Sequence, residues 1–390
     1  MLASAAGCSR SAQSHLDAGD TYARDKKDAE ALIEYRNAVQ RDPMLAPARL
    51  KLAEAYLKSG QAERAVGEYV RAADLMPRDL AVQLKTGGLL LRARRFDDAR
   101  GRADKVLAID PKSADGLVLR ANALAGLSDF AGAVEQMQQA LAIEGKAGYY
   151  ANLGAIQLAH GQRDEAEQAF RRALELDPTS MSTQLAWINF LWAAGRSTEA
   201  EAALRQAHGL DPKDRTVNGA LATYYLAVGR RAEAEPYLRQ VADASQDARP
   251  KLALANFYLA MGRQPDAERV LETLAATPRY WATARTQTAL LRQAEGRNDE
   301  ARAIIDEVLA KEPAHREARL ASARVAFSSG KRDEAQTILK QVVTEDPRNA
   351  DAQYLLGSVL AGAGKLEEAA RAFEEVLRIN PQASAAQSAS

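Results

Sequence analysis

The side chains most able to do chemistry are carboxylates in short charged segments, of which residues 161–178 (GQRDEAEQAFRRALELDP) are an example. Glu165, Glu167 and Glu175 could supply a pair for general acid–base catalysis, which needs two carboxyl groups close together. Acidic residues recur, however, in five further segments of the same form, at residues 60–77, 195–212, 296–313, 330–347 and 364–381. This recurrence indicates a repeated structural role on a solvent-facing surface, and we predict no catalytic residues.

The histidines and one glycine-rich segment do not form a convincing metal or phosphate site. His15, His160, His208 and His315 fall at positions 4, 14, 28 and 34 of the repeating unit described below, so stacked units would not bring them together. Residues 361–369 (AGAGKLEEA) imitate the end of a phosphate-binding loop, but they lack its first glycine and the Ser or Thr that follows its lysine. We therefore expect no metal and no cofactor.

The overall charge argues against a nucleic-acid-binding protein. The 52 basic and 52 acidic residues cancel, so the chain lacks the long-range field that attracts polyanions. The most basic stretch, residues 92–105, is either a local anion-binding patch or a solvated helix face. Cys8 is the one cysteine in the sequence, which excludes an intramolecular disulfide and a cysteine-based metal site. No run of eighteen apolar residues occurs, so we predict no membrane-spanning helix.

A period of 34 residues organises the charged segments. Each segment ends at a proline, and most of these prolines are 34 or twice 34 residues apart, at positions 43, 77, 111, 178, 212, 313, 347 and 381. Gly145 and Gln246 lie near the two places where a proline is absent, and Pro278 closes one copy a residue early. The period predicts eleven units over residues 12–383, with an irregular region near residues 248–285.

Each unit is predicted to be two helices joined by a turn. Gly161 ends the first helix of its unit, and Pro178, which lacks an N–H, ends the second. Glu167 and Arg171 form a favourably oriented pair one helical turn apart. In this second helix the apolar residues recur with the spacing of an amphipathic helix, at Ala166, Ala169, Phe170, Ala173 and Leu174.

This unit resembles the tetratricopeptide repeat, a helical hairpin with a large residue at position 4, Leu-Gly at 7–8, Ala at 20, a large residue at 24, Ala at 27 and Pro at 32. Residues 147–180 match that pattern at Tyr150, Leu153, Gly154, Ala166, Phe170, Ala173 and Pro178. Position 20 is alanine in the other ten units as well, at Ala31, Ala65, Ala99, Ala133, Ala200, Ala234, Ala267, Ala301, Ala335 and Ala369. The resemblance implies an all-α fold, a right-handed superhelical solenoid of about eleven repeats with a concave groove that binds protein or peptide partners.

By this resemblance, positions 2, 5, 9, 12 and 13 of each first helix face the groove. Position 9 carries Asn122, Asn189 and Asn256, whose amides can both donate to and accept from the backbone of an extended peptide. The neighbouring apolar side chains that would receive the side chains of this peptide are Leu185 and Leu252 at position 5, with Trp192, Leu226 and Leu259 at position 12. The alternative is that several of these leucines pack between helices and that the asparagines are ordinary polar residues of the groove.

A different class of tetratricopeptide protein grips the C-terminal carboxylate of a chaperone with lysines, an arginine and asparagines. Lys51 and Lys85 lie at position 6, which suits that function, but position 9 of the same units is Glu54 and Gly88. Glu54 would repel a carboxylate. The sequence therefore disfavours, without excluding, a co-chaperone.

The leader at residues 1–11 precedes the repeats. Small residues directly before Cys8 resemble the bacterial lipobox, in which a lipid is attached to the cysteine, and Ser9 resembles the second residue of outer-membrane lipoproteins. Ala5 departs from the preferred leucine, and the basic start and apolar core of a signal peptide are missing, as a truncated leader would explain. The alternative is an incidental thiol. The last residues, 384–390, are predicted to be a disordered tail.

These features together predict a non-enzymatic scaffold. The chain resembles bacterial tetratricopeptide lipoproteins, including those associated with exopolysaccharide export and with the PEP-CTERM sorting system. That resemblance implies a periplasmic protein that is attached to the outer membrane only through a lipid on Cys8 and that holds a partner protein or peptide. If the leader is accidental, the alternative is a cytoplasmic assembly adaptor.

Overall fold

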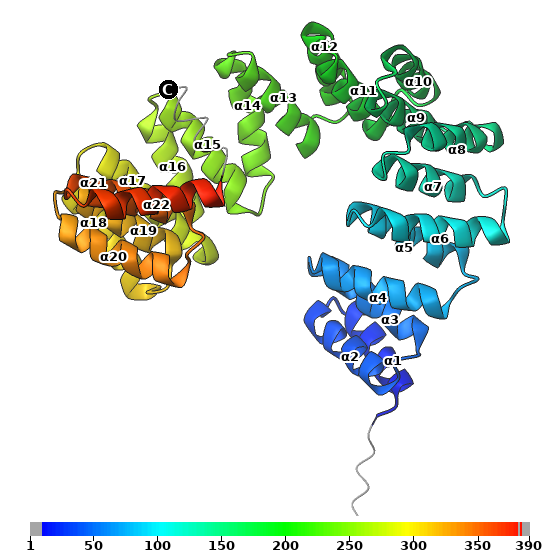
Figure 1. Cartoon of the computed structure of the whole chain (residues 1–390), viewed down its shortest axis with the longest axis horizontal. Helices are drawn as coiled ribbons and strands as arrows, with labels where there is room; N and C mark the ends of the chain where they lie inside the picture. Colours follow the sequence, from blue (N-terminus) through cyan, green and yellow to red (C-terminus); the bar gives the residue numbers. More distant parts are fainter. Residues whose placement is uncertain (1–9, 381–382, 384–390) are drawn as a thin grey trace, which may run out of the picture. The chain divides into compact units, whose positions relative to one another are not determined.

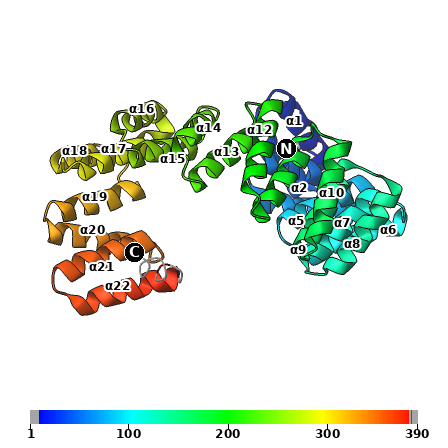
Figure 2. The same ribbon diagram turned by 90° about the horizontal axis from the view of Figure 1, so that it is seen from above.

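The computed structural model describes residues 10–380 and 383, and within these residues every regular element is helical. Twenty-two α-helices and one short 3-10 helix follow one another along the described chain (Figures 1 and 2). They form two compact units, which divide between Asp211 and Pro212. The prediction of an all-α chain of helical hairpins is confirmed.

The first unit contains six hairpins, each made of an odd-numbered helix and the even-numbered helix that follows it. The helices are α1 (Ala12–Arg24), α2 (Asp28–Arg41), α3 (Ala46–Lys58), α4 (Ala62–Leu75), α5 (Leu80–Arg92), α6 (Phe96–Ile109), α7 (Ala114–Gly126), α8 (Phe130–Ile143), α9 (Ala147–Ala159), α10 (Arg163–Leu176), α11 (Met181–Ala193) and α12 (Ser197–Leu210).

The second unit contains five hairpins and the 3-10 helix, which precedes α17. The elements are α13 (Arg215–Ala227), α14 (Arg231–Asp243), α15 (Ala248–Ala260), α16 (Gln264–Ala275), η1 (Pro278–Tyr280), α17 (Trp281–Ala294), α18 (Asn298–Lys311), α19 (Arg316–Ser328), α20 (Arg332–Glu345), α21 (Ala350–Gly362) and α22 (Leu366–Ile379).

The turn inside each hairpin needs one residue in the left-handed conformation. Eight hairpins place a glycine there, with φ between 70° and 84°, as at Gly161. The other three place Lys26, Arg94 and Ser128 at the equivalent position, with φ between 58° and 67°. A side chain in this conformation costs roughly 1–2 kcal/mol relative to glycine, so these three hairpins hold a strained residue.

The two helices of a hairpin meet where small residues allow a close approach. Alanine at position 20 is buried in all eleven hairpins, as the repeat pattern predicts. Gly154 of α9 lies against the ring of Phe170 in α10, and a Cβ atom on Gly154 would be 3.0 Å from that ring. The aromatic side chain therefore fills the space that the glycine leaves.

Successive hairpins within a unit pack through two kinds of contact. Each second helix packs against the following first helix, as α6 does against α7. The first helices also contact one another directly, as α5 does with α7, α7 with α9, and α17 with α19. The first helices of these neighbouring hairpins therefore lie against one another, on the face where the repeat pattern places the binding surface.

At position 4, where the repeat pattern has a large residue, several hairpins bury a polar side chain. Gln184 donates to the carbonyl of Pro178 at 2.8 Å, and Asn218 donates in the same way to Pro212 at 2.9 Å. Arg49 and Gln353 make the equivalent bond to Pro43 and Pro347. Each bond satisfies a carbonyl just beyond the end of a helix, where no intrahelical N–H is available.

Candidate protein-binding face

The carboxylate of Glu167 joins two hairpins. It accepts a hydrogen bond from Arg171 at 2.7 Å, which confirms the predicted pair, and it also binds Arg196 of the next hairpin at 2.8 Å. Hydrogen bonds from Arg196 and Arg171 hold the pKa of Glu167 below its usual range. Both guanidinium groups lie over the ring of Trp187. Glu167 is thus a structural contact between hairpins, and the expectation that it faces solvent as Glu165 does was wrong.

The histidines have separate surroundings. His15 bonds Glu34 at 2.5 Å, His160 stacks on Phe130, and His315 accepts the N–H of Ala318 at the start of α19. Among the described residues, no group of three His, Cys, Asp or Glu side chains could hold a metal ion.

The three asparagines of the predicted peptide ladder lie on first helices of different hairpins. Asn122 belongs to α7 and Asn189 to α11, and both helices are in the first unit. Asn256 belongs to α15 in the second unit. Asn189 and Asn256 are exposed and Asn122 is half-buried. The hairpin of α9 and α10 separates the first two, so the structure groups none of the three directly.

The apolar residues of the predicted groove share a helix face with these amides. Leu185, Asn189 and Trp192 are spaced by four and three residues along α11, as are Leu252, Asn256 and Leu259 along α15. Trp192 is 44% exposed and Leu226 on α13 is 40% exposed, while the three other leucines are half-buried. That these amides and apolar side chains contact a peptide stays a prediction.

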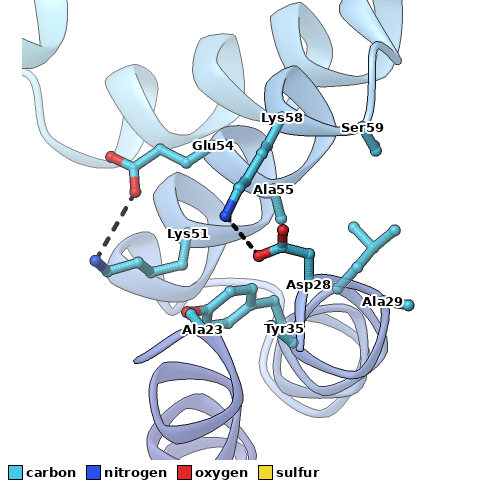
Figure 3. Close-up of a pocket in the computed structure, with 11 residues that line it drawn as sticks. Ala23, Asp28, Ala29, Tyr35, Lys51, Glu54, Ala55, Lys58 and Ser59 are labelled. Atoms are coloured by element: carbon cyan, nitrogen blue, oxygen red, sulfur yellow. Dashed lines mark hydrogen bonds and ion pairs between the residues drawn. The ribbon is translucent and has the colours of Figure 1, made fainter. Parts of the chain in front are cut away.

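Two hollows that we did not anticipate lie between successive hairpins at the start of the chain. The first, of about 460 Å³, lies between α2 and α3 (Figure 3). Lys58 reaches Asp28 at 2.6 Å, and Lys51 lies 3.8 Å from Glu54. Burial raises the pKa of the Tyr35 hydroxyl beneath them, as does its hydrogen bond to Asp20. Each cation of this hollow therefore has an acidic partner.

The second hollow, of about 840 Å³, occupies the equivalent place one hairpin later. It is lined by Leu57, Ala62, Glu63, Val66, Lys85, Leu89, Arg92, Ala93 and Arg95. Lys85 and Arg92 occupy the repeat positions of Lys51 and Lys58, namely 6 and 13. Lys85 was considered for a carboxylate-binding role, and Arg92 begins the basic stretch at residues 92–105. That the two share a helix face, seven residues apart on α5, was not predicted.

The membrane-related predictions gain no test from the described residues. None of their helices combines the length and the apolar character that crossing a bilayer requires. Cys8, the predicted lipidation site, lies outside the described residues, as do residues 1–9 of the leader and 384–390 of the tail.

Comparison with sequence families identifies the repeat. Two family models, each described as "Tetratricopeptide repeat", match the chain: one at residues 50–114, 286–335 and 320–384, the other at residues 114–274. No curated protein matches the sequence.

Solved structures with a similar arrangement are distant in sequence. A tetratricopeptide repeat protein from Parabacteroides merdae ATCC 43184 is 13% identical with a TM-score of 0.51, and the match covers 63% of this chain and 98% of that protein. MamA from Desulfovibrio magneticus RS-1 is 20% identical with a TM-score of 0.38, and the match covers 43% of this chain and 96% of that protein. Yeast Tom70 is 16% identical with a TM-score of 0.40, and the match covers 94% of this chain and 92% of that protein. The first of these similarities shows a shared fold.

Proposed function

Because the chain belongs to the tetratricopeptide-repeat family, we propose that it is a non-enzymatic scaffold that holds an extended segment of a partner protein on the face of its first helices. The observation that carries the proposal is the pairing of exposed amides with large apolar side chains on that face. Asn189 lies beside Trp192 on α11, and Asn256 lies beside Leu259 on α15. Amides can hold a peptide backbone while the apolar neighbours bury its side chains.

The test compares capture of partners by the wild-type chain and by asparagine variants. Asn122→Ala with Asn189→Ala removes the amides of the first unit, Asn256→Ala removes that of the second, and the triple variant removes all three. Mass spectrometry identifies the proteins that wild type captures. The triple variant should capture at least several-fold less of these proteins, while its melting temperature stays equal to that of wild type. Gln168→Ala, an exposed change on α10, is the matched control and should capture normally. Equal capture by the triple variant and wild type would contradict the amide ladder.

We propose in addition that the scaffold is tethered in a bacterial envelope through a lipid on Cys8, where it serves export of polysaccharide or protein. Support for the tether comes from the small residues before this single cysteine. Mass spectrometry of the protein expressed with its native upstream sequence should find a lipid-modified Cys8, and Cys8→Ser should move the protein out of the membrane fraction. An unmodified Cys8 would favour a cytoplasmic assembly adaptor.

A further inference from the structure

We infer that the second hollow, the 840 Å³ space bounded by α4 and α5, binds an internal acidic segment of a partner through side-chain carboxylates. The inference rests on the proposed scaffold function and gives one part of its surface a chemical specificity. It follows from comparing the two hollows, which have the same construction but differ in charge.

The first hollow neutralises its own cations. Asp28, the first residue of α2, binds Lys58, and Glu54 faces Lys51 from one turn further along α3 (Figure 3). An acidic ligand would have to displace these partners and would meet the repulsion of two carboxylates.

The second hollow lacks both of these acids. The residue equivalent to Asp28 is Ala62, and the residue equivalent to Glu54 is Gly88. Lys85 and Arg92 are exposed, and within the described part of the chain neither has a carboxylate within 4.0 Å. Arg95 binds Asp98 at 2.7 Å, and the remaining acid of the lining is the exposed Glu63. The hollow therefore presents two cations whose countercharge is missing.

The floor of the second hollow is apolar and already ordered. Val66 and Leu89 are buried and Leu57 is half-buried, so a leucine-sized side chain could rest on them without rearrangement. Lys85 and Arg92 are seven residues apart on α5, or about 10.5 Å along a helix that rises 1.5 Å per residue. In a peptide with the polyproline II conformation, which has three residues per turn and rises about 3.1 Å per residue, side chains three residues apart lie on the same face and are separated by about 9 Å. A segment with acids three positions apart and an apolar residue between them fits this spacing.

The experiment measures binding of a fluorescent peptide to the full chain. The probe carries blocked ends and two glutamates three positions apart with leucine between them; a second peptide has the same composition with the glutamates adjacent. Wild type should bind the spaced probe more tightly and lose affinity as salt is raised. Lys85→Gln with Arg92→Gln should weaken binding about tenfold, because both ion pairs with the glutamates of the probe are lost. The matched control, Lys51→Gln with Lys58→Gln, should change it less than twofold.

A second variant restores the missing countercharge. Gly88→Glu places a carboxylate at the position equivalent to Glu54. It should weaken binding of the probe as strongly as the double variant Lys85→Gln with Arg92→Gln, whereas Gly88→Gln should retain binding. A Cβ atom at Gly88 meets nothing within 4 Å, so both variants should melt at or above the wild-type temperature.

Several results would overturn the inference. The first two are an equal loss of affinity for Gly88→Gln and Gly88→Glu, and equal affinity of wild type for the two peptides. The third is a loss of affinity in the Lys51→Gln with Lys58→Gln control as large as in the Lys85→Gln with Arg92→Gln variant. The fourth is binding only of peptides that have a free C-terminal carboxylate. If the probe fails while wild type still captures partners through its asparagines, the inference falls and the scaffold function stands. If no partner is captured either, the scaffold function falls as well.

Discussion

At the scale of single residues, the same amino acid serves opposite purposes at adjacent positions of α5. Gly87 lies where the next hairpin packs, and a Cβ atom there would collide with the buried side chain of Leu119. Gly88 points into open space. The first glycine is needed for packing between hairpins, whereas a side chain at the second would meet no neighbour within 4 Å.

Substitution of these two glycines by alanine should therefore have opposite effects on stability. Gly88→Ala should stabilise the chain by roughly 0.5–1 kcal/mol, because alanine loses less conformational freedom in a helix. Gly87→Ala should destabilise it by about 1–3 kcal/mol, as overpacked cores do. Urea unfolding of the two variants checks the prediction, which is wrong if both changes shift the midpoint in the same direction.

At the scale of elements, polar contacts within and between hairpins complement the apolar core. Arg49 of α3 binds Glu68 of α4 at 2.5 Å with both side chains nearly buried, and Arg102 of α6 binds Asp74 at 2.8 Å. Gln184 is 2% exposed and caps the carbonyl of Pro178. The bond of Gln184 aligns α11 with the end of the hairpin before it.

Replacing Gln184 with leucine should reveal what such a bond contributes. The change keeps the size of the side chain but leaves the Pro178 carbonyl without its donor, which should lower the free energy of unfolding by about 1–3 kcal/mol. Ser182→Ala, on the exposed side of the same helix, should change it by less than 0.5 kcal/mol. Thermal unfolding followed by circular dichroism measures both, and an unchanged melting temperature for Gln184→Leu would refute the role.

The elements could be predicted from the sequence because local backbone chemistry sets their ends. Gly161 and Pro178 act within one or two residues, and the alanines at position 20 repeat with the period of the chain. The charged contacts could not be predicted in the same way. Glu167 was correctly paired with Arg171 in its own helix, but its second partner, Arg196, lies in the next hairpin, where several arginines compete for each acid. The two hollows could not be predicted for the same reason, because their lining depends on which residues of one hairpin face the next hairpin.

At the scale of the whole molecule, the contacts of each hairpin are with its neighbours in the chain. Ala335 of α20 is fully buried in a cluster with residues of α19 and α21, such as Ala326 and Leu356. The buried cluster around Met137 lies in the other unit and draws on α7, α8 and α9. Stability in such an array is a sum of local terms.

A disruption in one unit should consequently stay local. Ala335→Leu should overpack its cluster, at a cost of about 1–3 kcal/mol, and should lower amide hydrogen-exchange protection in α19 to α21. Protection in α7 to α9 should match wild type. Hydrogen exchange with mass spectrometry distinguishes the two regions, and equal loss of protection in both would show that the described chain unfolds as one cooperative body.

The bridge from Arg196 back to Glu167 is repeated in the second unit, where Arg263 binds Glu235 of the preceding hairpin at 2.6 Å. The arginine follows the first helix of one hairpin, and the acid lies in the second helix of the hairpin before it. A hairpin that has both the arginine and the acid can form this ion pair with the hairpin before it through the arginine, and with the hairpin after it through the acid. A tandem duplication of such a hairpin would create a new ion pair between hairpins without any further mutation, so a gene of this kind can lengthen by whole 34-residue steps.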